Sequence, residues 1–321
     1  MTGPDAGSAG GAGGAAARPS VGFVGLGVMG RPMARHILDA GFVLTVASRS
    51  RGPVDELAAA GATAADAPAD VARVAHVIIL MLPDPPDVGT VIFGPGGLVE
   101  TARPGTVIVD MSTGDPLLAR DWAEQLAKKS VDLLDAPVSG GEAGAIAGTL
   151  SIMVGGRAEA LERARPALEP MSSRIVHVGD SGAGQIAKAA NQLVVGSTIQ
   201  AVAEALLLAR AAKVDPARVR EALLGGFAAS RVLELHGQRM IDANYKPGAR
   251  STLHRKDARI IQKLARSIGV PTPGFDQAAF GYEELVDRGD GGMDHSALVV
   301  LLEEQAGIRV ADPPDWEEAP E

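Results

Sequence analysis

The sequence predicts a doubly wound α/β domain with a mostly parallel sheet, followed by an all-α domain that a long interdomain helix joins to it. Three observations lead to this prediction. Short Val/Ile-rich runs alternate with Ala/Leu-rich stretches over residues 20–182, a run from residue 184 to about 213 is apolar on all sides, and only helical patterns follow it within residues 183–308. At 321 residues the chain is also too long for most single hydrophobic cores.

Seven apolar runs in the first domain have the continuity of strands that are covered on both faces. Helical stretches separate them, which implies right-handed crossovers between parallel strands. The runs are VGFVGLG (21–27), VLTVASR (43–49), HVIILMLP (76–83), TVIVDMS (106–112), VDLLDAP (131–137), LSIMVGG (150–156) and RIVHVG (174–179).

The apolar run that opens the second domain would form a helix about 45 Å long at 1.5 Å per residue. A helix without a polar face must be buried, so we expect an obligate homodimer or homotetramer. The Gly/Ala-rich residues 1–19 and the acidic residues 309–321 are expected to be disordered tails. Further helices are expected over residues 216–225, 254–269, 278–289 and 294–307.

Composition excludes several classes of function. The formal net charge of -9 argues against nucleic acid as a partner, because phosphate backbones are bound mainly by basic surfaces. The absence of cysteine removes disulfides, thiolate nucleophiles and zinc–thiolate sites. Residues 1–19 lack the basic start and aliphatic core of a signal peptide, and no other run of about 18 aliphatic residues suggests a membrane span. We therefore expect a cytoplasmic protein that does not bind membranes.

A glycine motif, G-x-G-x-x-G, joins the first strand directly to the following helix. In this context the first glycine makes the turn, the second admits a pyrophosphate to the backbone, and the third lets helix and strand pack closely. The phosphates would lie at the helix N-terminus. The motif predicts a Rossmann-type dinucleotide site whose loop comprises Gly25, Leu26, Gly27, Val28, Met29 and Gly30.

The end of the second strand bears on the choice of cofactor. NAD-preferring sites usually place an acid there to bind the adenine ribose, but this strand ends in VASRSR. Ser48, Arg49 and Ser50 suit a 2′-phosphate instead, so NADP(H) is expected in preference to NAD(H). The alternative is that Arg49 and Arg51 are solvated loop charges.

A nicotinamide cofactor moves a hydride, so a protein group has to handle the matching proton. The Tyr-x-x-x-Lys arrangement of short-chain dehydrogenases is absent, and so is cysteine. The histidines show no metal-type spacing, so each is interpreted as structural and no metal site is predicted. They are His36, His76, His177, His236, His254 and His295.

This elimination leaves Lys188 in GAGQIAKAANQ (182–192), a lone ammonium in an apolar helical run. Asn191 lies three residues later, on the same face of the helix. It could bind a substrate hydroxyl or orient the ammonium.

The stretch DAPVSGG follows a predicted strand and places Ser139, Gly140 and Gly141 at the strand's carboxyl end. Backbone without side chains, next to a hydroxyl, offers several donors to a carboxylate. A plain turn is the alternative. The position at the end of a parallel strand, where such sheets bind ligands, favours a binding loop.

The stretches GFVGLGVMGRPMA, DAPVSGG and GAGQIAKAANQ, in this order, resemble the β-hydroxyacid dehydrogenase family, which includes 3-hydroxyisobutyrate dehydrogenase. MLP (81–83), MST (111–113) and HRKD (254–257) add to the resemblance, which covers residues 20–306. Within the family, the tartronate semialdehyde reductase branch is the one that the chain resembles most, in the stretches LSIMVGG, YKPG, LHRKD and DHSAL.

The resemblance implies a role for each motif. Lys188 would be the catalytic acid/base, Asn191 would bind substrate, and Ser139, Gly140 and Gly141 would hold a small carboxylate substrate. Lys256 would reach across from the helical domain to the cofactor. The other implied cofactor-binding residues are Met81, Leu82, Pro83, Asp87 and Thr113.

The implied reaction transfers a hydride between a nicotinamide cofactor and a short 3-hydroxy or 3-oxo acid. Reduction of tartronate semialdehyde to glycerate is the first choice, and 3-hydroxyisobutyrate or 4-hydroxybutyrate (from succinate semialdehyde) are the alternatives. Arg231 lies in a region that faces the substrate in relatives, so its charge would change which acid fits if it also faces the substrate here, and would have no effect if it points outward. Two further hypotheses are an NADPH-dependent imine reductase and a non-catalytic cofactor-binding module. The presence of Lys188 argues against both.

Overall fold

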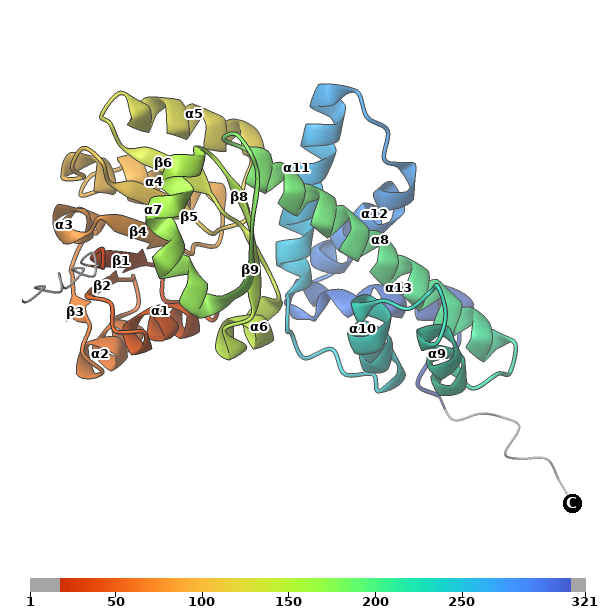
Figure 1. The fold of residues 1–321 in the computed structure, drawn as a ribbon. Coiled ribbons are helices and arrows are strands. Elements are labelled where there is room, and N and C mark those ends of the chain that lie inside the picture. The colour runs from red at the N-terminus through yellow and green to blue at the C-terminus, as the bar shows by residue number, and fades with distance from the viewer. Residues whose placement is uncertain (1–17, 313–321) are drawn as a thin grey trace, which may run out of the picture.

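The computed structural model describes residues 18–312, so residues 1–17 and 313–321, most of the two predicted tails, lie outside the described residues. Figure 1 shows a sheet covered by helices and a separate group of helices, with α8 (Ala183–Ala211) running from one into the other. The predicted fold class, a doubly wound α/β domain followed by an all-α domain, is confirmed.

Within residues 18–312 the sheet has nine strands in the order β3-β2-β1-β4-β5-β6-β8-β7, with β9 paired to β8. The pairs β6·β8 and β7·β8 are antiparallel, and the others are parallel. The strands are β1 (Val21–Val24), β2 (Leu44–Ala47), β3 (Thr63–Ala64), β4 (Val77–Leu80), β5 (Val107–Asp110), β6 (Asp132–Asp135), β7 (Val138–Ser139), β8 (Leu150–Gly155) and β9 (Ser172–Gly179).

The strand order reverses at β1, because β1 lies between β2 and β4. The loops after β1 and β4 therefore emerge side by side at the carboxyl ends of their strands. Open α/β sheets bind their ligands at such points. The fold thus brings the glycine loop and the MLP segment to one place.

The strands read as continuous apolar runs because each face of the sheet has its own hydrophobic core. Val77 and Ile79 enter one core, whereas Ile78 and Leu80 enter the other. The helices of this domain are α1 (Gly30–Asp39), α2 (Arg51–Ala59), α3 (Pro68–Val74), α4 (Pro85–Phe93), α5 (Pro116–Ala127), α6 (Gly141–Ala147) and α7 (Ala158–Leu168), with 3-10 turns at Leu98–Glu100 and Glu169–Met171.

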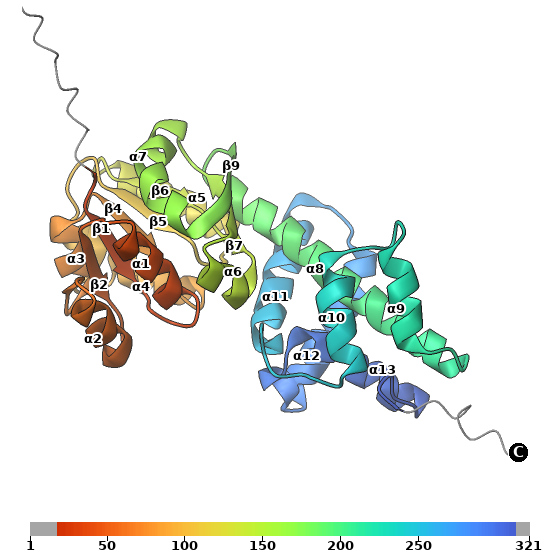
Figure 2. The same cartoon turned by 60° about the horizontal axis from the view of Figure 1, so that its bottom comes forward.

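The helical domain is built around α8, which Figure 2 shows passing through the centre of the other helices. Helix α8 ends two residues earlier than expected, since Lys213 takes a left-handed conformation with φ +60°. One helix, α10, was not among those expected; the Ser230 hydroxyl caps it by accepting from Leu233 N at 3.0 Å. The helices are α9 (Pro216–Leu224), α10 (Arg231–Ile241), α11 (Ser251–Ile268), α12 (Pro273–Asp287) and α13 (Leu298–Ala306), with 3-10 turns at Asp290–Gly292 and His295–Ala297.

The start of α8 is anchored to the sheet. The carboxylate of Asp135, the last residue of β6, accepts from Gly182 N at 2.7 Å and from Gln185 N at 2.8 Å. Gly182 has φ +87°, which favours glycine, and Gly184 lies so close to β6 that an added Cβ would be 2.2 Å from the Asp135 carbonyl. These contacts fix the direction in which the next turn of α8, with Lys188, projects.

By length and composition α8 could cross a membrane, with a mean hydropathy of 1.5 in its most apolar window. Of that window, 39% is buried within the chain, and the buried residues of α8 contribute to the core of the helical domain. A core helix of a helical domain meets the same criteria.

Candidate active site

The three glycines of the nucleotide motif differ in their surroundings. Gly25 has φ +99° and lies against Met81 O, which an added Cβ would approach to 2.3 Å. At Gly30, the first residue of α1, a Cβ would meet Gly25 O at 1.9 Å. Gly27, in contrast, has no atom within 4 Å of its Cβ position. The loop is therefore compact on its inner side and open at Gly27, next to the α1 N-terminus, which fits the pyrophosphate of a dinucleotide.

The turn after β2 carries the residues expected to select the cofactor. The Ser48 hydroxyl accepts from Leu26 N at 3.3 Å, which ties this turn to the glycine loop. Arg49 is 82% exposed, and its Nη1 lies 3.6 Å from Asp87 Oδ1. Arg51, in contrast, is held by Asp55 and Asp66 at 2.7 and 3.3 Å. Arg49 is thus the cation of this turn that can reach a ligand by giving up one weak surface contact.

The helical domain holds the loops that follow β4 and β5. Lys256, on α11, donates from Nζ to Pro83 O at 3.1 Å and to Thr113 O at 3.0 Å. Gln185, in the first turn of α8, accepts from Gly114 N and donates to Ser112 O, both at 2.8 Å. Lys256 thus reaches from the helical domain to the sheet domain, and its contact with the cofactor stays a prediction. Gln185 was not singled out from the sequence, although it is a polar residue in an apolar run.

Lys188 is buried, with 7% of its surface exposed, and its partner is Gln192. Its Nζ donates to Gln192 Oε1 at 3.0 Å, and Asn191 Nδ2 donates to the same oxygen at 2.9 Å. Gln192 Nε2 in turn donates to Asp257 Oδ2 at 2.7 Å. Asn191 therefore makes no direct contact with the ammonium; Gln192, one helical turn after Lys188, makes that contact and joins the two side chains.

Asp257 connects Lys188 and Gln192 to the loops after β4 and β5, which are expected to bind the cofactor. Its Oδ1 lies 3.4 Å from the Nζ of Lys256, the lysine that holds Pro83 and Thr113. Burial lowers the pKa of Lys188; the negative charge of Asp257 opposes this shift, and the positive charge of Lys256 adds to it. A lysine with a lowered pKa gives up its proton more readily, which suits a group that donates a proton in one reaction direction and accepts it in the other.

The Ser139-Gly140-Gly141 stretch is a junction of two elements and not a loop. Ser139 ends β7, which pairs with β8, and Gly141 begins α6. Both glycines have positive φ, +135° and +60°, and the Cβ position of Gly141 has no neighbour within 4 Å. Backbone groups are therefore accessible at this strand end. Strand β8, which pairs with β7, also packs against α8, the helix that carries Lys188.

Arg231 follows the second of its two alternatives. It is the first residue of α10, its side chain is 71% exposed, and its Nη1 lies 2.6 Å from Glu234 Oε2, three residues later. The local helical pair holds the guanidinium at the surface, so an effect of Arg231 on substrate choice is no longer expected.

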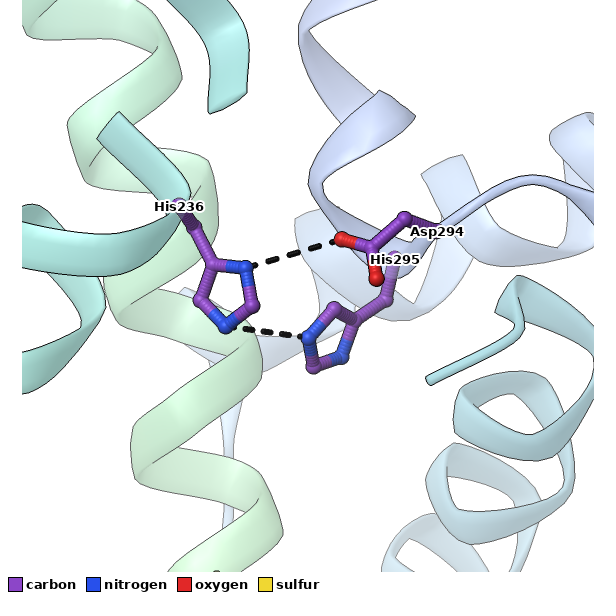
Figure 3. Close-up of side chains that lie close together, drawn as sticks. All are labelled: His236, Asp294 and His295. Atoms are coloured by element: carbon purple, nitrogen blue, oxygen red, sulfur yellow. Dashed lines mark hydrogen bonds and ion pairs between the residues drawn. The ribbon is translucent and has the colours of Figure 1, made fainter. Parts of the chain in front are cut away.

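Three histidines that are distant in the sequence lie together in the helical domain. Figure 3 shows His236 on α10 facing His295, with Asp294 beside them, and His254 on α11 contacts His295 from the other side. Burial, followed by the charges of Lys188 and His236, lowers the pKa of His254 to about 3. Spacing in the sequence gave no sign of this cluster, because its members are up to 59 residues apart.

Two family models of dinucleotide-dependent dehydrogenases match the two domains of the chain. Residues 20–179 match the family model of the NAD binding domain of 6-phosphogluconate dehydrogenase. Residues 182–302 match that of the NAD-binding region of NADP-dependent 3-hydroxyisobutyrate dehydrogenase. A dinucleotide-binding sheet domain joined to a helical domain with a buried lysine defines an NAD(P)-dependent oxidoreductase that acts on CH–OH groups.

Individual relatives show which family of these oxidoreductases the chain belongs to. The chain is 43% identical to 2-hydroxy-3-oxopropionate reductase of Escherichia coli K12, over 91% of this chain and 99% of that protein. It is 36% identical to 3-hydroxyisobutyrate dehydrogenase of Pseudomonas aeruginosa, over 88% and 97%. It is 31% identical to a solved structure of Mycobacterium tuberculosis 3-hydroxyisobutyrate dehydrogenase with L-serine, over 88% and 99%, with a TM-score of 0.81. The chain belongs to the 3-hydroxyisobutyrate dehydrogenase-like family of hydroxyacid dehydrogenases.

Proposed function

We propose that the protein reduces short 3-oxo acids, with tartronate semialdehyde to glycerate as the main reaction and NADPH as the preferred reductant. The observation that carries this proposal is the continuous chain of contacts from Lys188 through Gln192 and Asp257 to Lys256, which holds the cofactor loops. The 43% identity to 2-hydroxy-3-oxopropionate reductase supports the choice of substrate.

The residues present account for the proton in this reaction. A bound nicotinamide cofactor supplies or accepts the hydride. During reduction the Lys188 ammonium gives a proton to the carbonyl oxygen as this oxygen becomes a hydroxyl, and Lys188 remains as the neutral amine. In the oxidation direction the amine takes the hydroxyl proton. Gln192 Oε1 keeps the Lys188 Nζ in place in both directions.

Substrate choice rests on one carboxylate. The N–H groups and hydroxyl of Ser139, Gly140 and Gly141 would bind it, and Asn191 Nδ2 would face a hydroxyl or carbonyl oxygen once it leaves Gln192. Hydrogen bonds to a charged group are worth about 1.5–3 kcal/mol, so acids should exceed uncharged carbonyls by roughly ten- to a hundredfold in kcat/KM.

A panel of tartronate semialdehyde, methylmalonate semialdehyde, succinate semialdehyde, an uncharged ketone and a cyclic imine tests this expectation. The three acids should rank first, with tartronate semialdehyde above the other two by a margin of about 1–3 kcal/mol. A higher kcat/KM for the ketone or the imine than for all three acids would remove the carboxylate argument. Solved imine reductases share the fold at 20–21% identity, which supports no more than the fold.

Cofactor preference rests on Arg49. An Arg–phosphate pair at this exposed turn is worth about 1.5–3 kcal/mol, so NADPH should exceed NADH by roughly ten- to a hundredfold in kcat/KM. The preference should weaken in high salt, as it does for exposed ion pairs. Replacing Ser48 by Asp and Arg49 by Gln should reverse it without changing kcat.

Arg51→Gln is the matched control, because Asp55 and Asp66 already engage that guanidinium. It should leave the NADPH/NADH ratio of wild type unchanged. If wild-type kcat/KM with NADH equals or exceeds that with NADPH, the reading of this turn is refuted.

We also propose that the chain assembles as a homodimer or homotetramer. Support comes from apolar side chains that remain exposed on the helical domain, among them Val194, Leu208 and Phe227. Large apolar side chains exposed to this extent are often covered by a partner subunit.

A further inference from the structure

The histidine cluster forms a row of three close contacts across the helical domain. From inside outward, His254 Nδ1 lies 3.1 Å from His295 Nδ1, His295 Nε2 lies 3.2 Å from His236 Nε2, and His236 Nδ1 lies 3.5 Å from Asp294 Oδ1. Figure 3 shows the last two of these contacts. The inner end of the row is the His254 ring, which packs against α8.

At that inner end the His254 ring is packed tightly against the helix. An added Cβ at Gly196 would be 2.7 Å from His254 Nε2. This nitrogen makes no well-formed hydrogen bond, although the Gln192 carbonyl is near enough to raise the pKa of His254 against the larger effects of burial and of neighbouring positive charges. The row therefore ends outside on a carboxylate and inside on a buried ring nitrogen that has no hydrogen-bond partner.

Counting protons shows that three neutral histidines cannot satisfy every nitrogen of this row. Each of the three contacts joins two atoms with lone pairs and needs one hydrogen between them, and each neutral imidazole supplies one N–H. If the three N–H groups fill the three contacts, His254 Nε2 is left as a buried acceptor without a donor. A fourth proton would create a buried imidazolium, which desolvation opposes, since His254 and His295 are only 2% and 7% exposed.

We propose that a divalent transition-metal ion of the zinc class binds between His236 Nε2 and His295 Nε2. Two nitrogen ligands at about 2.0–2.1 Å from a tetrahedral ion lie about 3.3 Å apart, close to the observed 3.2 Å. The three N–H groups then serve the two remaining contacts and His254 Nε2. His236 Nδ1–H donates to Asp294, His295 Nδ1–H donates to His254, and His254 Nε2–H points to the Gln192 carbonyl.

Asp294 orients His236 in this arrangement and leaves the other coordination positions to water. Its Oδ1 already accepts from Ser296 N at 3.1 Å and from Ser296 Oγ at 2.6 Å, and its Oδ2 accepts from Gly248 N at 2.9 Å and Ala249 N at 3.1 Å. Ligating histidines commonly donate their second N–H to a carboxylate fixed in this way. His236, Asp294 and His295 present ligand atoms within 4.8 Å of one another.

Charge and access set the strength of the site. Arg239 Nη1 lies 3.8 Å from Asp294 Oδ2, on the side away from His236, and its positive charge limits affinity for a cation. His236 is 18% exposed, which gives an ion a route to the site from solvent. A bound ion would link α10 to the turn that precedes α13, so it should stabilise the helical domain.

The test uses the full-length protein after treatment with a chelator. Titration with Co²⁺, followed by visible absorption, should show one ion per chain with the intense bands of tetrahedral coordination, and Zn²⁺ should displace it and raise Tm. His236→Gln should weaken binding at least about tenfold and abolish the rise in Tm. His76→Gln removes a histidine of the sheet domain and should leave both unchanged.

Tm of His236→Gln without metal, compared with metal-free wild type, shows whether the variant is folded. Absence of saturable Co²⁺ binding in wild type would overturn the proposal without any variant. Binding that persists in His236→Gln would show surface coordination elsewhere and would equally overturn it. None of these readouts depends on the enzymatic activity proposed above.

Discussion

Lys188→Ala should lower kcat by about 10²–10⁴-fold in both reaction directions, with cofactor binding nearly unchanged. Lys188 is buried, and its Nζ makes one well-defined contact, at 3.0 Å to Gln192. In reduction the lysine must be protonated. Because burial lowers its pKa from the usual 10.5, the alkaline limb of the pH profile should lie below that value. Steady-state kinetics over a pH series measures both effects.

The free energy of unfolding of the Lys188 variants shows whether a loss of activity comes from lost catalysis or from a lost fold. A lowered pKa means that the folded chain binds fewer protons than the unfolded chain between the folded and unfolded pKa values of Lys188. Stability therefore rises with pH across that window, and below it the buried ammonium costs stability. Removing Lys188 leaves no acceptor unpaired, because Asn191 still donates to Gln192 Oε1.

Lys188→Met should accordingly unfold at a free energy equal to or above that of wild type at neutral pH, while being as inactive as the alanine variant. Lys213→Ala, which removes the exposed lysine just after α8, is the control for loss of a cation and should keep full activity. A folded Lys188 variant whose kcat stays within about threefold of wild type would remove this residue from the mechanism.

Local patterns account for most of what could be predicted from the sequence. The glycine loop depends on residues within one strand–helix connection, and the lone lysine stands out because its neighbours are apolar. Helix α10 was missed because its start depends on a serine cap. The direction of Arg231, its first residue, was left open because it depends on the pairing with Glu234, three residues away.

Contacts between residues that are far apart in the chain could not be predicted from the sequence. Gln192 and Asp257 are 65 residues apart, and His236 and His295 are 59 apart. Their meeting depends on how α8, α10, α11 and the His295–Ala297 turn pack. Gln185 likewise makes contacts more than 70 residues away. No periodicity or spacing reports such contacts, since polar residues on helices are common on any solvated face.

The same substitution at two glycines of the nucleotide motif should produce opposite phenotypes. At Gly30 an alanine Cβ would lie 1.9 Å from Gly25 O, a backbone atom that cannot move without shifting the loop. Gly30→Ala should therefore lower the free energy of unfolding by about 1–3 kcal/mol or more. At Gly27 nothing lies within 4 Å of the Cβ position, so Gly27→Ala should leave Tm unchanged or slightly raised.

Cofactor binding should show the reverse pattern at Gly27. The open space there is where the pyrophosphate approaches the backbone, so a methyl group should weaken NADPH binding at least about tenfold, or 1.4 kcal/mol. Fluorescence titration with NADPH, alongside thermal unfolding of the same samples, measures both quantities. Gly52→Ala is the matched control, since its Cβ position is also open but lies within α2; it should bind NADPH as wild type does. If Gly27→Ala binds NADPH as tightly as Gly52→Ala, the open face of the loop is not where the phosphates lie.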